Sequence, residues 1–258
     1  MKELLYGRHA VEESLLANRR DIFNIYISER AKLPVQSRLK QLAGKRRIPL
    51  KFVPKNQLDH KVGRVNHQGM VAEVSSYPYC EIDDLLPSED ALPNPIILLL
   101  DCLQDPQNLG ALIRSAEAAG VAGIVLPRNR SVNVTPAVVN ASAGAVEHLR
   151  VALITNLART IARLKKEGFW IVGLEAEPEA HRYDQVDLNV PLGLVVGSEG
   201  RGLGRLVKER CDYLVKLPMR GHISSLNASI AGSIVLYEAW RQRNITTDTP
   251  PVCPSPPR

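Results

Sequence analysis

Short apolar runs alternate with amphipathic stretches from residue 95 to residue 243, and this alternation constrains the fold more than any other feature of the chain. PIILLLD (95–101) is a continuous apolar run, as expected of a parallel strand that is covered on both faces. NLGALIRSAEAAG (108–120) places its apolar residues on one helical stripe and closes with a glycine. The same strand-then-helix order recurs to residue 243, and it predicts an α/β fold with an open, mainly parallel sheet.

Residues 1–75 form a second predicted unit, a small α/β domain with a basic excess. Helices are expected over 6–20, 35–47 and 56–63, and strands over 22–28, 48–54 and 69–75. These residues hold 15 Lys and Arg against 7 Asp and Glu, a net charge of +8, whereas the whole chain carries +6. Such a domain favours a polyanionic partner, most often nucleic acid, although small domains also carry charge for solubility.

Two further segments complete the predicted organisation. SSYPYCEIDDLLPSEDALPNP is rich in Pro, Ser and acidic residues, so we expect a linker over 76–94. TTDTPPVCPSPPR is Pro-rich, and we expect a disordered tail over 245–258. The α/β sheet domain is therefore expected to span 95–244.

Several classes of protein are disfavoured by what the sequence lacks. No apolar run approaches the ~18 residues of a membrane span, and the N-terminus shows no apolar signal core. The four cysteines form no CxxC pair and have no clustered histidines beside them, so neither a metal site nor a disulfide framework is expected. A reducing cytoplasm fits this cysteine usage.

Three loops are candidates for a ligand site, because ligands of open α/β sheets bind outside the carboxyl ends of the strands. They are DCLQDPQNLG (101–110), GSEGRGLG (197–204) and PMRGHISSLN (218–227). The glycine spacing of the second matches neither the GxGxxG dinucleotide motif nor a P-loop. The loops suit a cofactor that is approached by backbone groups, but glycine counts do not specify a reaction.

The three loops and their flanks resemble the ordered motifs of the SpoU–TrmH family of RNA ribose 2′-O-methyltransferases. The matching segments are LDCLQDPQNLGALIRSAEAAG (100–120), LVVGSEGRGLGRLVKERCDYLVKLPM (194–219) and ISSLNASIAGSIVLYEAWRQR (223–243). LLYGRHAVEESL (4–15) and NHQGMVAEV (66–74) are similar to the N-terminal domain of the ribosomal RNA subgroup, often called RlmB-type. The resemblance covers about 240 residues and leaves out only the tail.

The resemblance implies a SPOUT-type fold with a C-terminal trefoil knot, preceded by an RNA-binding domain similar to ribosomal protein L30e. It implies S-adenosylmethionine as cofactor, no metal, and a homodimer that builds its site from both subunits. The implied reaction is 2′-O-methylation of a guanosine in large-subunit (23S) ribosomal RNA. Transfer RNA or another ribosomal RNA site is the alternative substrate, and a non-catalytic ribosome assembly factor is the alternative function.

Eight residues match functional positions of the family. The resemblance implies catalytic roles for Asn108, Arg114, Glu199, Ser225 and Asn227, and cofactor contacts for Gly197, Leu217 and Leu226. Six of them have a structural alternative: a helix cap for Asn108, Glu199 and Ser225, a solvated surface position for Arg114, and a core position for Leu217 and Leu226. Because an arginine stays charged, we expect Arg114 to bind RNA phosphate rather than to act as a base. Asn140 stands where the family often has a basic residue, which leaves an RNA contact there in doubt.

Overall fold

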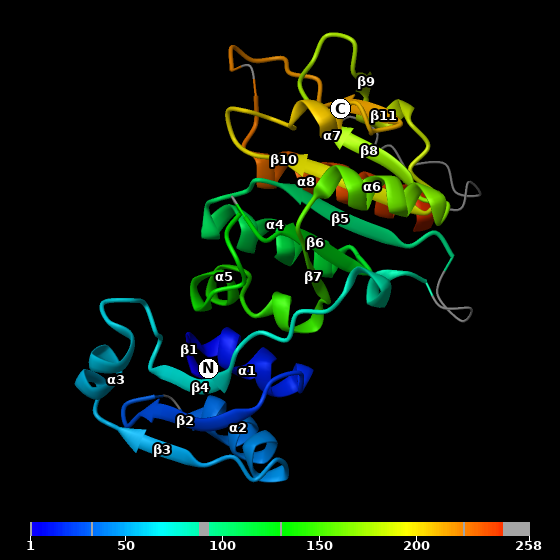
Figure 1. Ribbon diagram of the computed structural model, residues 1–258. Coiled ribbons are helices and arrows are strands. Elements are labelled where there is room, and N and C mark those ends of the chain that lie inside the picture. Colours follow the sequence, from blue (N-terminus) through cyan, green and yellow to red (C-terminus); the bar gives the residue numbers. More distant parts are fainter. Residues whose placement is uncertain (1, 32, 88–92, 130, 224, 245–258) are drawn as a thin grey trace, which may run out of the picture.

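The computed structural model of the protein contains two β-sheets of different size (Figure 1). It describes residues 2–31, 33–87, 93–129, 131–223 and 225–244. The Pro-rich tail and Cys253 lie outside the described residues. No described helix is long and apolar enough to cross a membrane.

The smaller sheet is formed by the basic N-terminal residues. Its strands lie in the order β1 (Lys2–Tyr6), β4 (Met70–Ser75), β2 (Ile22–Ser28) and β3 (Leu50–Val53). β2 and β3 are parallel, whereas β4 is antiparallel to both of its neighbours. The helices of this part are α1 (Arg8–Ala17), α2 (Leu33–Lys45) and α3 (Lys55–Val62). The sequence predicted a helix that begins at Tyr6. In the structure Tyr6 ends strand β1, and Gly7, at φ +95°, turns the chain into α1.

The larger sheet has seven strands, and every pair in it is parallel. In spatial order the strands are β7 (Val151–Ile154), β6 (Gly123–Pro127), β5 (Ile96–Asp101), β10 (Leu192–Gly197), β8 (Trp170–Leu174), β11 (Tyr213–Lys216) and β9 (His181–Arg182). The predicted α/β fold with a parallel sheet is therefore confirmed.

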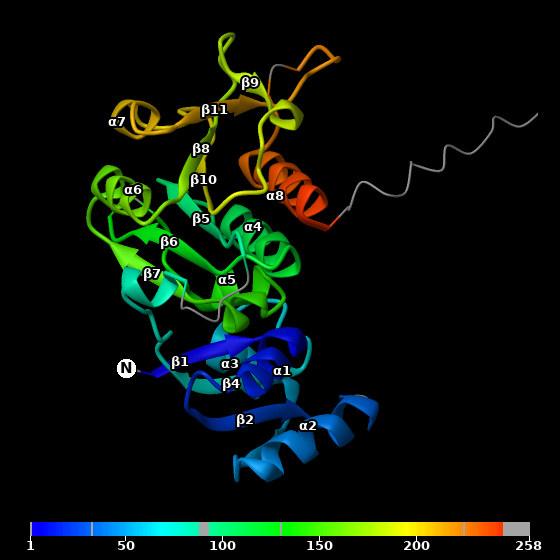
Figure 2. The ribbon, with the colours of Figure 1, turned by 90° about the vertical axis from the view of Figure 1, so that its right-hand side faces the viewer.

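Helices cover both faces of this sheet (Figure 2). α4 (Pro106–Ala118), α5 (Pro136–Ala141) and α8 (Ala228–Asn244) pack together on one face, and α6 (Leu157–Lys166) and α7 (Arg205–Lys208) pack together on the other. Short 3₁₀ turns complete the described elements: η1 (Ile82–Leu85), η2 (Ala145–His148) and η3 (Tyr183–Gln185).

The central strands position the candidate site. β5 and β10 are buried along their whole length and pair in register from Ile96–Leu192 to Asp101–Gly197. β5 and β10 are neighbours in the sheet; β6 lies on the far side of β5, and β8 lies on the far side of β10. Their carboxyl ends are therefore adjacent where the strand order reverses, which is where open α/β sheets bind ligands.

The two parts of the chain meet through buried polar contacts. The Arg20 guanidinium lies 2.9 Å from the Glu147 carboxylate, and both side chains are fully buried. The Tyr77 hydroxyl donates to the backbone oxygens of η2 and its flank, at 3.0 Å from Val146 and 2.6 Å from Leu149. Asn140 donates to the backbone oxygen of Tyr6. That contact gives Asn140 a structural role at the position where an RNA contact was in doubt.

Candidate active site

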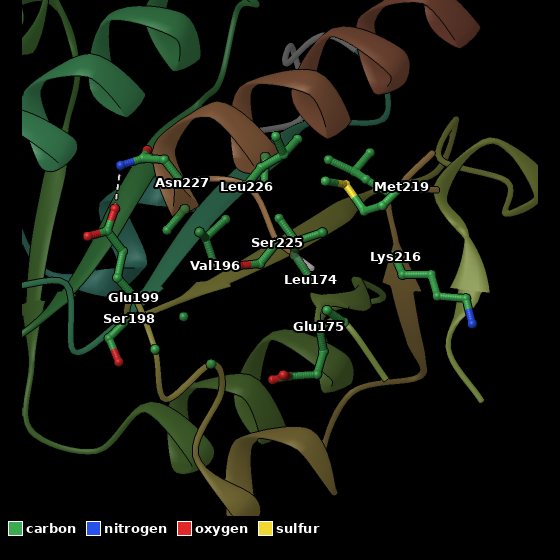
Figure 3. Close-up of a pocket in the computed structure, with 17 residues that line it drawn as sticks. Leu174, Glu175, Val196, Ser198, Glu199, Lys216, Met219, Ser225, Leu226 and Asn227 are labelled. Atoms are coloured by element: carbon green, nitrogen blue, oxygen red, sulfur yellow. Dashed lines mark hydrogen bonds between the residues drawn. The ribbon is translucent and has the colours of Figure 1, made fainter. Parts of the chain in front are cut away.

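Three loops converge at the carboxyl end of the large sheet, as the sequence predicted. A cavity of about 420 Å³ lies among the ends of β8, β10 and β11 and the segment before α8 (Figure 3). Six of the eight predicted site residues line it: Gly197, Glu199, Leu217, Ser225, Leu226 and Asn227. A small-molecule site in a protein typically has a volume of about 300–1,000 Å³, so the cavity is large enough for a cofactor.

A hydrogen-bonded network links three of the predicted residues across long sequence distances. The Asn108 amide donates to Oε1 of Glu199 at 2.9 Å. The Asn227 amide donates to Oδ1 of Asn108 at 2.8 Å and also to Oε1 of Glu199. Figure 3 shows Glu199 and Asn227 pointing toward each other at one end of the cavity. One residue from each of the three motifs therefore meets here.

Asn227 holds this position because it also caps helix α8. Its Oδ1 accepts from the backbone amides of Ser229 and Ile230, at 2.9 and 3.3 Å, and from the Ser229 hydroxyl. An asparagine is well suited to both tasks, since its oxygen accepts from the helix start while its amide donates elsewhere. Ser225 was a candidate for this cap, but the structure assigns the cap to Asn227.

The two other capping alternatives are also excluded. α4 is capped by Asp105, whose Oδ1 accepts from the backbone amide of Gln107 at 3.0 Å, so Asn108 lies inside the helix. α7 follows Gly204 and has no side-chain cap. Glu199 instead accepts from the two asparagine amides, and its carboxylate is thereby fixed at the edge of the cavity.

The glycine-rich loop folds back over the end of its own strand. Gly200 and Gly202 have φ of +78° and +63°, which glycine adopts without strain. A Cβ on Gly197 would lie 2.4 Å from the backbone carbon and oxygen of Gly202, so a side chain at 197 would collide with the returning chain. The Gly204 amide donates to Asp101 at 2.7 Å and the Leu203 amide to Glu175 at 2.8 Å, and these bonds tie the loop to β5 and β8.

Other lining residues were not predicted from the sequence. Glu175 follows β8, while Lys216 and Met219 lie at and beyond the end of β11. Met219 lies within the predicted loop 218–227, but no feature of the sequence singled it out; Glu175 lies outside the three predicted loops, and the rule that ligands bind at the carboxyl ends of strands could have identified it. Ala228 and Ala231, at the start of α8, also line the cavity and leave it open because their side chains are small.

A second cavity of about 510 Å³ adjoins the first across the glycine-rich loop. It is lined by Asn108 and the loop after β5, including Asp105, and it shares Ser198, Glu199 and Gly202 with the first cavity. Glu199 therefore borders both cavities. Two ligands, one in each cavity, would meet beside its carboxylate.

Arg114 is the predicted residue that the structure does not bring to either cavity. It lies exposed on α4, and its side chain has no hydrogen bond or ion pair among the described residues. On the same helix, Ala111 and Ser115 line an apolar groove against α8. Arg114 therefore belongs to the outer surface of the α4–α8 pair.

The described residues offer neither a reactive Cys211 thiol nor a cluster of metal-ligating side chains. Burial raises the pKa of Cys211 to about 12, so its thiol is not a nucleophile at neutral pH. No group of His, Cys, Asp and Glu side chains is arranged to hold a metal ion within the described ranges. The two cavities are lined mainly by carboxylate, amide, hydroxyl and apolar groups, with the Lys216 ammonium and the Cys102 thiol among them.

Comparison with known proteins agrees with this geometry. Residues 95–237 match the SpoU rRNA Methylase family, and residues 4–80 match the RNA 2′-O ribose methyltransferase substrate-binding family. A Bacillus subtilis protein assigned by name to the TrmH family of tRNA/rRNA methyltransferases is 44% identical over 243 residues, which cover 94% of this chain and 96% of that protein.

Solved structures share the fold over nearly the whole chain. An AdoMet-bound rRNA methyltransferase from Sinorhizobium meliloti is 25% identical, with a TM-score of 0.78 over 95% of this chain and 88% of that one. The SpoU methyltransferase AviRb from Streptomyces viridochromogenes, in complex with AdoMet, is 23% identical, with a TM-score of 0.78 over 94% of this chain and 90% of that one. The chain belongs to the SpoU rRNA Methylase family.

Proposed function

We propose that this protein transfers a methyl group from S-adenosylmethionine to the ribose 2′-hydroxyl of a guanosine in large-subunit ribosomal RNA. The observation that supports it most is the Asn108–Glu199–Asn227 network, which joins the three family motifs at the edge of a cofactor-sized cavity. Methyltransferase chemistry on RNA with S-adenosylmethionine follows from family membership. The nucleotide, the class of RNA and the roles of single residues are our proposal.

The lining of the first cavity fits this cofactor. Leu217 and Leu226 offer apolar surface to an adenine ring, while Ser225 and the backbone around Gly197 offer hydrogen-bonding groups. Bound there, S-adenosylmethionine supplies an electrophilic methyl group on a positively charged sulfur. We assign Gly197, Leu217 and Leu226 to holding it.

We assign Glu199 and its two amide donors to positioning the acceptor ribose. Both amides contact Oε1, and within the described residues Oε2 has no partner. Oε2 is therefore available to accept a hydrogen bond from a ribose hydroxyl in the neighbouring cavity. Holding the hydroxyl in this way lowers the entropic cost of bringing the two reacting ligands together. Ser225 also lines the first cavity, and with Arg114 it completes the proposed catalytic set.

Arg114 suits a role across a homodimer. The outer face of α8 exposes Ile230, Ile234, Tyr237 and Trp240, at 52%, 37%, 48% and 43%. A contiguous apolar face of this kind marks an interaction surface, and a second copy is the occupant that the family implies. Arg114 lies beside this face, so in a dimer it would reach the partner's RNA rather than its own cavity, where its charge would bind phosphate.

Ribosomal RNA is the substrate that the N-terminal part favours. That part carries the basic excess of +8, and it matches a substrate-binding family of RNA 2′-O-methyltransferases. The named Bacillus relative leaves tRNA and rRNA both open. We also propose residues 1–75 as an L30e-like domain, 76–94 as its linker, 95–244 as a SPOUT domain with a C-terminal trefoil knot, and the cytoplasm as the compartment.

The substrate is tested by competition between RNAs. Unmodified 23S rRNA and unmodified tRNA transcripts are incubated separately and together with the protein and labelled S-adenosylmethionine. We expect label in the rRNA, at one guanosine. Label in tRNA alone would overturn the substrate, and cofactor binding without label in either RNA would favour an assembly factor.

A further inference from the structure

The basic N-terminal part contains a cavity of its own, apart from the candidate active site. It has a volume of about 340 Å³ and lies between the end of β2, the start of α3 and the loop 65–69. Arg30, Lys55, Asp59, Asn66 and Gln68 are among the residues that line it. Figure 1 shows β2, β3 and α3 at the end of the molecule opposite β11 and α7, so this cavity is remote from the proposed methyl-transfer site.

The wall of this cavity is held by a buried histidine. His67 is 2% exposed, and its Nδ1 accepts from the backbone amide of Gly69 at 3.0 Å. Its Nε2 therefore carries the proton and donates to Oδ1 of Asp59, also at 3.0 Å. Gly69, at φ +77°, allows the tight return of the loop. The imidazole thus fixes the loop against α3, and the cavity is preformed.

The charges in the cavity suit an anion that also carries hydroxyl groups. Among the described residues, neither the Arg30 guanidinium nor the Lys55 ammonium has an ion-pair partner, so both are available to a phosphate. The Asp59 carboxylate and the Asn66 amide offer acceptors and donors to a ribose or a base edge, and Gln68, whose Oε1 accepts from the Arg8 backbone amide, offers its amide N–H groups. A nucleotide presents both kinds of group.

A cationic and aromatic surface continues from the cavity along β2. Side chains alternate along a strand, so Ser28, which lines the cavity, shares a face with Tyr26. The Tyr26 ring lies 4.2 Å from the Lys61 ammonium and 5.5 Å from the Lys51 ammonium, measured to the ring centroid. Aromatic rings flanked by cations stack bases and attract phosphates of single-stranded RNA.

We propose that this cavity binds one ribonucleotide of the RNA substrate, outside the nucleotide that is methylated, and that Tyr26 stacks a neighbouring base. The inference rests on the proposed function in taking RNA as the ligand. In it, Arg30 and Lys55 hold the phosphate, and the fixed loop reads the ribose or base. The subsite anchors the RNA at a distance from the reacting ribose.

The first experiment measures RNA binding without cofactor. Filter binding with unmodified 23S rRNA and tRNA transcripts compares the wild type with Arg30→Ala/Lys55→Ala and with a control that removes the same charge, Lys40→Ala/Lys45→Ala on α2. We expect the cavity variant to weaken rRNA binding about tenfold or more near 0.1 M salt, because two phosphate contacts are lost. Its salt slope should fall by about 1.4 to 1.8, at 0.7 to 0.9 for each contact.

The control decides whether the effect belongs to the cavity. Ile25 and Ile27 alternate with Tyr26 and are buried in one core with Leu39 and Ala43 of α2, so α2 covers the other face of the sheet. We expect the α2 control to change the affinity less than about twofold, because its charges make no direct contact with the RNA. Equal losses in the two variants, or no loss in either, would overturn the subsite. Thermal unfolding of each variant checks that the fold is retained.

The second experiment tests Tyr26 and the source of the nucleotide. Tyr26→Phe should keep rRNA affinity, whereas Tyr26→Leu should lower it, because only the aromatic ring stacks. Photo-crosslinking of 4-thiouridine-labelled rRNA should map to Tyr26 or to residues 55–69. Crosslinks confined to residues 95–244 would contradict the proposal. Displacement of rRNA by guanosine or adenosine monophosphate in 100-fold excess would also contradict it, and would make the cavity a free-nucleotide site.

The nucleotide subsite and the proposed methyl transfer can fail independently, and the experiments distinguish the two failures. If the protein methylates rRNA but the cavity variant binds and turns over like the α2 control, the subsite alone fails. If the cavity variant loses rRNA binding but the wild type transfers no methyl group, the proposed reaction alone fails. When both hold, a short RNA that contains only the target region should show the same KM with wild type and cavity variant.

Discussion

Glu199 is a surface carboxylate whose position is set by residues far away in the sequence. The Asn108 and Asn227 amides both donate to its Oε1, and Asn227 is itself fixed as the cap of α8. The sequence offered a helix cap as the alternative role for Glu199 and for Asn108, since acids and amides are common at helix starts. Only the three-dimensional structure could decide, because the competing partner lies 91 residues away.

Replacement of Glu199 by glutamine tests its role in positioning the ribose. A glutamine oxygen can still accept from both asparagines, but its amide group would replace the free carboxylate oxygen. We expect kcat to fall about 100-fold, because the ribose hydroxyl loses the carboxylate oxygen that positions it, while the Kd for S-adenosylmethionine stays within about threefold.

Single-turnover kinetics and calorimetric titration measure these two quantities for Glu199→Gln. Glu209→Gln is the matched control, because Glu209 is exposed and pairs with Arg205 outside both cavities. Unchanged kcat in Glu199→Gln would remove Glu199 from the catalytic set.

Gly197 is required by the returning chain, whether or not it also touches a ligand. In Gly197→Ala the new Cβ would lie 2.4 Å from the Gly202 backbone, so the loop must shift. We expect a loss of about 2 kcal/mol in the free energy of unfolding, typical of overpacking, measured by urea denaturation. Gly221→Ala, with no atom within 4 Å of the new Cβ, should stay within about 0.5 kcal/mol of the wild type. Equal stability of the two variants would contradict the crowded loop.

At the scale of elements, the sequence predicted long and strongly patterned segments best. β5 and β10 are continuous apolar runs, and α4 carries one apolar stripe, so local pattern suffices for them. β1 was missed because its strand state depends on antiparallel pairing with β4, about 70 residues later. β9 has two residues and exists through its pairing with β11, which no local pattern announces.

The candidate site was likewise predicted where local motifs sufficed and missed where distant packing decides. The second and third motifs predicted six residues that share one cavity, and the first motif contributes Asn108 to the adjoining cavity, because loops at the carboxyl ends of adjacent parallel strands must meet. Arg114 lies outside both cavities, since its helix turns it to the outer surface. Which helix faces stay exposed depends on packing between α4 and α8, and the apolar groove there became visible only in the structure.

The exposed face of α8 predicts self-association. We expect the wild type to sediment at twice the chain mass of 28.5 kDa, and Ile230→Glu/Ile234→Glu to sediment as a monomer, because two carboxylates would be buried without partners. Leu206→Glu is the control, since Leu206 is 58% exposed on α7, and α7 lies on the face of the sheet opposite α8. Analytical ultracentrifugation measures all three. A monomeric wild type, or a dimeric double variant, would contradict a dimer through α8.

At the scale of the whole molecule, a buried ion pair joins the N-terminal part to the large sheet domain. Arg20 contacts Glu147 at 2.9 Å and Glu3 at 2.8 Å, and its own side chain is fully buried. The exposed pair between Glu13 and His148, at 2.8 Å, crosses the same boundary. The first pair should contribute far more to cohesion than the second, because removal of one partner leaves a buried charge uncompensated.

We expect Glu147→Ala to lower the free energy of unfolding by about 3–5 kcal/mol. Glu13→Ala removes a carboxylate from the same boundary and should cost less than about 1 kcal/mol, as exposed pairs do. Urea denaturation measures both. Similar losses in the two variants would mean that the buried pair does not hold the parts together.

The most direct test of the account is the chemical identity of the product. Unmodified 23S rRNA is incubated with the protein and S-adenosylmethionine carrying a trideuterated methyl group, then digested to nucleosides and analysed by mass spectrometry. We expect guanosine labelled on its 2′-oxygen, and about 100-fold less of this product from Glu199→Gln within the time of one wild-type turnover. A label on a base, or no label despite cofactor and RNA binding, would contradict the ribose-methylating site described around Asn108, Glu199 and Asn227.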